Sequence, residues 1–148
     1  MSSITREELV RIDAGIKSIY RTRTLAGLCK DLSHELAAKL TDKHRVTPSV
    51  VKFMIGPNQD PHYAVVIARK HLSDRFLTTE YPAESTVIID PTIKQFSVEN
   101  AEKTIVNTGL APAADLPELG IYPPNTPQRC SWYHHDKYVN ETALIIDE

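Results

Sequence analysis

The sequence has few of the features that mark disulfide-rich, membrane-spanning or nucleic-acid-binding proteins. It contains only two cysteines, Cys29 and Cys130, which are too few for the disulfide framework of a small secreted domain. Its net charge is −2, and its Lys and Arg residues are scattered rather than gathered in a basic stripe. No apolar run approaches the roughly 20 residues that cross a bilayer. We therefore expect no nucleic-acid partner and no membrane span.

The N-terminal segment, MSSITREELVRI, also lacks the hydrophobic stretch of a signal peptide, so we expect synthesis in the cytoplasm. There the two cysteines are expected to be free thiols. A single bridge between them is the alternative, and it would block Cys29 as a nucleophile. The chain has 148 residues, 41% of them hydrophobic, and no internal repeat, which predicts a single domain spanning residues 1–148 around one core.

Two amphipathic helices are predicted in the first third of the chain. Thr5 and Glu8 have the spacing of a capping box, and the apolar residues that follow recur at helical spacing, which predicts a helix over about residues 5–20. A ladder of leucines four residues apart predicts a second helix over about 27–40. Cys29 lies near the start of this second helix, at the edge of its apolar stripe.

Strands follow the helices. Apolar runs predict three strands at residues 49–55, 62–70 and 85–90, which we expect to form an antiparallel sheet packed on the helices. Residues 97–106 are expected to form a short helix and 142–147 one more strand. Residues 109–128 contain five prolines and are expected to be an irregular loop. The predicted fold class is α+β.

Three residues in this framework form a candidate catalytic set, with Cys29 at a helix start, His62 at a strand start and Asp90 at a strand end. A free thiol has a pKa of about 8.5, so it needs help to become a nucleophile at neutral pH. A helix N-terminus favours the thiolate, an imidazole takes the proton, and a carboxylate orients the imidazole. The backbone N–H of Cys29 is a natural oxyanion donor. The acidic neighbour Asp31 opposes thiolate formation.

The motifs around these residues resemble a known superfamily. GLCKDLSHELAAKL, PHYAVVI and STVIIDPTIKQF are similar to the Cys–His–Asp core of papain-like and transglutaminase-like proteins, nearest to the compact papain-fold toxins that deamidate glutamine. The resemblance covers about residues 25–96. It implies a papain-like fold, with N-terminal helices packed on an antiparallel sheet, and a catalytic Cys29, His62 and Asp90.

One position departs from the resemblance. Papain-like peptidases usually carry an oxyanion glutamine before the cysteine, whereas this chain has Arg and Thr residues at 21–24. Gln95, in the QF of the last motif, is the candidate oxyanion or cleft residue. No cofactor and no metal are implied.

Each of these residues also has an ordinary structural interpretation. Cys29 alone would be a small packing residue, His62 a surface residue, and Asp90 a turn residue before Pro91. His34 competes for the base role, although its place one turn along the same helix directs it elsewhere. A zinc site formed by Cys130 with the two histidines at 134–135 is disfavoured, because the paired short spacings of structural zinc ligands are missing.

The resemblance implies acyl transfer through a thioester. The form of this reaction that it favours is glutamine deamidation of a target protein by a bacterial effector or toxin. A cysteine peptidase or a transglutaminase of the same fold, or a catalytically inactive papain-like binding module, are the alternatives. The implied partners are a protein substrate and a cognate inhibitor or immunity protein. Cytoplasmic synthesis followed by delivery into a target cell through a specialised secretion system would fit this role.

Overall fold

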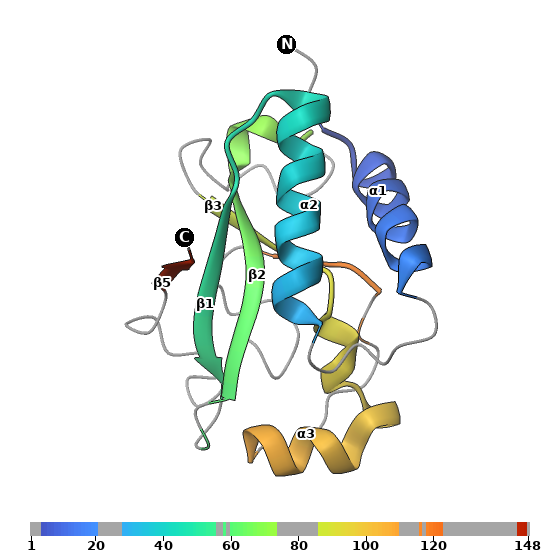
Figure 1. Ribbon diagram of the computed structural model, residues 1–148, viewed down its shortest axis with the longest axis vertical. Helices are drawn as coiled ribbons and strands as arrows, with labels where there is room; N and C mark the ends of the chain where they lie inside the picture. The colour runs from blue at the N-terminus through green and yellow to red at the C-terminus, as the bar shows by residue number, and fades with distance from the viewer. Residues whose placement is uncertain are drawn as a thin grey trace.

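The computed structural model describes residues 4–20, 28–55, 58, 60–73, 86–109, 116, 118–122 and 145–147. The helices are α1 (Arg6–Ile19), α2 (Cys29–His44) and α3 (Ala101–Thr108), with three short 3-10 helices, η1 (Arg69–His71), η2 (Ile93–Phe96) and η3 (Val98–Asn100). The strands are β1 (Ser49–Ile55), β2 (Asp60–Ala68), β3 (Thr86–Asp90), β4 (Gly120–Tyr122) and β5 (Ile145–Asp147). All five strands form one antiparallel sheet in the order β4-β3-β2-β1-β5, so the α+β prediction is confirmed (Figure 1).

The capping box starts α1 as predicted. The Glu8 N–H donates to Thr5 Oγ1 at 3.1 Å, and the Thr5 N–H donates to Glu8 Oε1 at 3.3 Å. Two backbone donors that a helix start leaves unpaired are thereby satisfied. The helix then buries Leu9, Ile12 and Ile16.

Helix α2 begins at Cys29 and extends to His44, four residues beyond the predicted end. The added turn carries no buried apolar residue, so the leucine ladder gave no sign of it. The helix ends at Arg45, which adopts the left-handed conformation (φ 53°) and donates its N–H to the Thr41 carbonyl at 3.0 Å. The four leucines of the ladder are all buried: Leu28, Leu32, Leu36 and Leu40.

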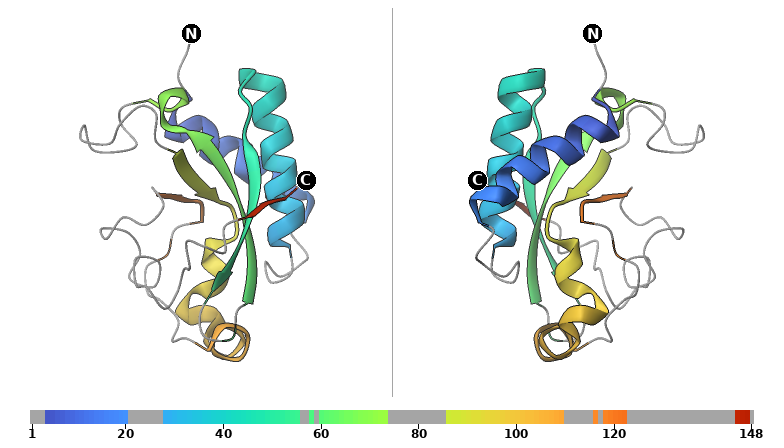
Figure 2. Two further views of the ribbon diagram at one scale, coloured as in Figure 1. Left: turned by 90° about the vertical axis from the view of Figure 1, so that its left-hand side faces the viewer. Right: turned by 90° about the vertical axis from the view of Figure 1, so that its right-hand side faces the viewer.

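Both long helices cover one face of the sheet. Their buried residues form a single cluster with Val65 and Ile67 of β2 and with Val87 and Ile89 of β3. The first turn of α2 lies towards the end of the molecule that carries η2, η3 and α3 (Figures 1 and 2). The fold thus brings the start of α2 towards the end of β3.

The observed elements differ from the prediction at three places. Strand β4 lies within 109–128, where a loop was expected, because a three-residue strand among prolines is too short to show a period of two. Strand β2 begins at Asp60 rather than at residue 62. The expected helix at 97–106 is the 3-10 helix η3 followed by α3, which ends at Thr108. The strand expected at 142–147 contains β5.

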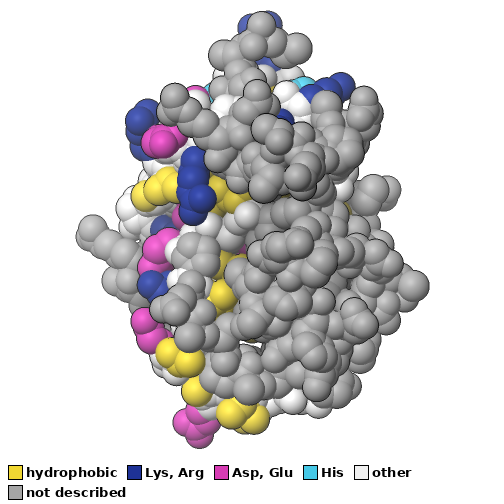
Figure 3. All heavy atoms as spheres, turned by 180° about the vertical axis from the view of Figure 1, so that it is seen from behind, with side chains coloured by type: hydrophobic (Ala, Val, Ile, Leu, Met, Phe, Trp, Pro, Cys, Tyr) yellow, Lys and Arg dark blue, Asp and Glu magenta, His cyan; other side chains and the backbone are white. Residues whose placement is uncertain are grey.

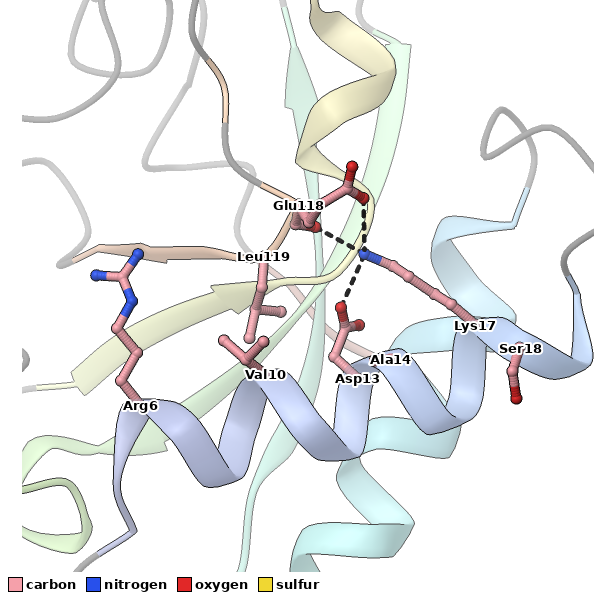
Figure 4. A pocket seen from close by; sticks show the side chains of 8 residues that line it. All are labelled: Arg6, Val10, Asp13, Ala14, Lys17, Ser18, Glu118 and Leu119. Carbon is pink, nitrogen blue, oxygen red and sulfur yellow. Dashed lines mark hydrogen bonds and ion pairs between the residues drawn. The ribbon is translucent and has the colours of Figure 1, made fainter.

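A charged network joins α1 to the segment before β4 (Figure 4). Lys17 Nζ contacts Asp13 Oδ2 at 2.8 Å and donates to the Glu118 carbonyl at 2.7 Å. Glu118 Oε1 in turn accepts from Lys94 Nζ of η2 at 2.8 Å. Asp13 is only 4% exposed, and its burial raises its pKa to about 6 against the opposing effect of Lys17. An ionised Asp13 therefore costs stability, in spite of its ion pair.

This pKa predicts how folding stability depends on pH. Because the folded state holds the Asp13 proton up to about pH 6 and the unfolded chain releases it near the ordinary 3.8, the Asp13 contribution to stability rises as the pH falls from 7 towards 4. We expect the free energy of unfolding to gain about 1–3 kcal/mol from this group. Urea unfolding measures the free energy of unfolding of wild type and of Asp13→Asn at several pH values. The difference between the two proteins gives the contribution of Asp13 at each pH. Parallel pH profiles would contradict it.

Candidate active site

Cys29 is the first residue of α2 and carries a half-buried free thiol. The first hydrogen bond of the helix runs from the Leu32 N–H to the Leu28 carbonyl at 2.9 Å. The N–H of Cys29 therefore has no acceptor within the helix, and the apolar Leu28 side chain cannot cap it. A thiol here lies beside a backbone donor that the helix leaves unpaired and beside the positive end of the helix dipole.

His62 and Asp90 form the buried centre of the site. His62 Nε2 lies 2.7 Å from Asp90 Oδ2, and the two side chains are 1% and 0% exposed. The antiparallel register of β2 and β3, which pairs Val65 with Ile89, brings the two residues together at the end of the shared ladder. The alternative interpretation of His62 as a surface residue is wrong, because its ring is buried against the Asp90 carboxylate.

Cys29 completes this row of side chains. Its thiol lies within hydrogen-bonding reach of the His62 imidazole. Since Nε2 faces Asp90, a proton that passes between His62 and Cys29 would use Nδ1. A cation–π contact between the residues that follow Cys29 and His62 also links the start of α2 to β2. Lys30 Nζ lies 5.4 Å from the centre of the Tyr63 ring.

The turn after β3 contacts both the Asp90 carboxylate and the His62 imidazole. The Thr92 N–H donates to Asp90 Oδ1 at 3.1 Å, and Gln95 Nε2 donates to Thr92 Oγ1 at 2.9 Å. The same Gln95 nitrogen lies 3.5 Å from His62 Nδ1. Phe96 meets the imidazole edge to face, with ring centres 4.9 Å apart and planes at 72°. One short segment thus positions the carboxylate, the ring and the Gln95 amide.

The electrostatics of His62 follow from these contacts. Burial disfavours the imidazolium, but the charge and hydrogen bond of Asp90, with the nearby Cys29 sulfur, outweigh burial and raise the pKa of His62 to about 10. The site therefore favours a charged imidazole that contacts a carboxylate and has a thiol nearby. This arrangement is suited to forming a thiolate–imidazolium pair.

The structure brings together all four residues singled out in the sequence: Cys29, His62, Asp90 and Gln95. His34, the rival base, is a half-buried residue in the second turn of α2. Thr92 and Phe96 were not identified from the sequence, although both lie in the DPTIKQF motif, where an Asp two residues before a Thr indicates a side-chain-to-backbone turn.

The other sequence candidates for a metal site are Cys130 and the two histidines near it. Cys130 and the histidines at 134–135 lie outside the described residues. Among the residues that the structure does describe, no group of three or more His, Cys, Asp or Glu side chains is arranged to hold a metal ion. Nor does any helix in those ranges have the length and apolar character to cross a membrane.

Comparison with protein-family models, with curated proteins and with solved structures finds no match to this chain. The chemistry of the site must therefore be inferred from its residues and their geometry.

The raised pKa of His62 predicts that its imidazole loses its proton only at high pH. We expect the imidazole resonances of wild type to titrate near pH 10, and Asp90→Asn to lower the midpoint by about 2 units or more because the main stabilising charge is lost. Since the folded pKa lies above the unfolded 6.5, the pair stabilises the fold fully below that pH and loses its contribution as the pH rises through 10. NMR titration of both proteins measures the midpoints. A wild-type midpoint near 6.5 would refute the described coupling.

Proposed function

We propose that this protein is a papain-like enzyme that transfers acyl groups from amides through a Cys29 thioester. The observation that carries the proposal is the buried 2.7 Å contact between His62 Nε2 and Asp90 Oδ2, with the Cys29 thiol near the same imidazole. A carboxylate, an imidazole and a thiol in this order form a nucleophile, its base and the group that orients the base.

The reaction begins when the Cys29 sulfur, having given its proton to His62, attacks the carbonyl carbon of the substrate amide. The resulting oxyanion accepts a hydrogen bond from the Cys29 N–H at the helix start, and the Gln95 amide is the second candidate donor. Asp90 stabilises the imidazolium during this step through its contact with Nε2.

The tetrahedral intermediate then collapses. The C–N bond breaks, His62 protonates the departing nitrogen, and the acyl group stays on Cys29 as a thioester. Water, deprotonated by His62, attacks the thioester and releases the carboxylic acid and the free thiol. With a glutamine side chain as the substrate, the products are ammonia and glutamate.

Glutamine deamidation of a target protein is the favoured reaction. Its support is the resemblance of residues 25–96 to the papain-fold deamidase toxins, together with the geometry of the residues that carry that resemblance. We accordingly infer a bacterial effector or toxin that acts on a protein substrate.

Substitution of the three central residues tests this function. Cys29→Ala should abolish turnover, and His62→Ala should be nearly as damaging because the two residues act as a unit. Asp90→Asn should reduce turnover by at least about tenfold, because the amide still fills the space but no longer stabilises the imidazolium. The assay measures ammonia release and the intact mass of a glutamine-containing test protein.

Deamidation adds about one dalton for each glutamine converted to glutamate, whereas a peptidase would release fragments. Near-ultraviolet circular dichroism of each variant checks that the fold is retained. A Cys29→Ala variant with wild-type turnover would end the proposal.

A further inference from the structure

Thr92 occupies a central place in the hydrogen bonds of the site. Its side chain is fully buried, at 0% exposed, in the turn that follows Pro91. Its hydroxyl lies 3.5 Å from Asp90 Oδ1 and accepts a hydrogen bond from Gln95 Nε2 at 2.9 Å. His62 also contacts Asp90 and Gln95, so the side chains of His62, Asp90, Thr92 and Gln95 form a closed ring of contacts.

The chemistry of these groups decides which of them donates and which accepts in each hydrogen bond. An ionised Asp90 can only accept hydrogen bonds, so the single hydroxyl proton of Thr92 points to Oδ1. The Thr92 oxygen is then left as an acceptor, and Gln95 must turn its NH2 group towards it. The contact of 3.5 Å is long for a hydrogen bond, but the reverse arrangement would place an oxygen lone pair of Thr92 against a carboxylate.

The orientation of the Gln95 amide decides what the second imidazole nitrogen meets. With its NH2 group near Nδ1, Gln95 cannot accept the proton of a charged imidazole. A rotated amide would place its oxygen there and take that proton in a hydrogen bond, in competition with the Cys29 sulfur.

We propose that Thr92 is a positioning residue whose hydroxyl keeps the Gln95 amide oxygen turned away from His62, so that Nδ1 exchanges its proton with Cys29. This role rests on the proposed function, in which Cys29 and His62 act as the nucleophile pair. It differs from the anchoring of Asp90 by the Thr92 backbone N–H, which any residue at this position except proline could provide.

Two substitutions separate the hydroxyl from the rest of the side chain. Thr92→Val keeps the shape and the backbone N–H but removes the hydroxyl, whereas Thr92→Ser keeps the hydroxyl. We expect the alkylation of Cys29 by iodoacetamide at pH 6 to fall about tenfold in Thr92→Val, and to stay within about twofold of wild type in Thr92→Ser. The 15N resonance of His62 Nδ1 should shift in Thr92→Val only.

A second substitution distinguishes this role from a general loss of structure. Adding Gln95→Met to Thr92→Val removes the amide oxygen that would capture the Nδ1 proton, so the double variant should alkylate about as fast as wild type. Damaged packing at Thr92 would not be repaired by a change at Gln95. A double variant as slow as Thr92→Val would overturn the proposal.

Gln95 provides the same test if Thr92→Val does not fold. Gln95 is half-buried, and Gln95→Glu places only oxygens beside Nδ1. Gln95→Glu should therefore slow the alkylation of Cys29 as Thr92→Val does. The matched variant Gln95→Met should not slow it. Equal rates in these two variants would overturn the proposal.

Failure of the proposed function would look different. If wild-type Cys29 reacts only as an ordinary thiol, the nucleophile pair is refuted, and the Nδ1 resonance alone decides the role of Thr92. A shift of that resonance in Thr92→Val that is reversed by Gln95→Met supports the positioning role, and an unchanged resonance overturns it.

Discussion

The contact between His62 and Asp90 is the interaction on which the rest of this structure depends. Both side chains are buried, and an imidazolium or a carboxylate alone in such a place would be strongly disfavoured. Removing one partner of a buried ion pair typically costs about 3–5 kcal/mol, because the other charge is left uncompensated. The register of β2 with β3 and the turn through Thr92 keep the pair together, so the framework that stabilises the fold also defines the site.

The site is assembled from parts of the chain that meet only in the folded protein. Helix α2 supplies Cys29 and its backbone N–H, β2 supplies His62, and β3 with η2 supplies Asp90 and Gln95. The long helices pack on one face of the sheet through a single apolar cluster, and that packing fixes the start of α2. At the same end, η3 and α3 expose the apolar side chains of Val98, Ile105 and Val106. Figure 3 shows hydrophobic side chains at the foot of the molecule.

Much of this framework could be predicted from local patterns. The capping box gave the start of α1, the leucine ladder gave α2, and apolar runs gave the three long strands. Strand β4 could not be predicted, because a three-residue strand depends on β3 as its partner rather than on its own sequence. The order of Cys29, His62 and Asp90 along the chain predicted the partner of His62, but not its burial, which depends on the register of β2 with β3.

The measurement that tests the central claim most directly is the rate at which iodoacetamide alkylates Cys29 between pH 5 and 8, compared between wild type and His62→Ala. It needs no knowledge of the target protein and reports on the thiol itself. If the imidazole activates the thiol, wild type should react at least about tenfold faster than the variant at pH 6. Equal rates in the two proteins across this range would show that Cys29 and His62 are neighbours without forming a nucleophile pair.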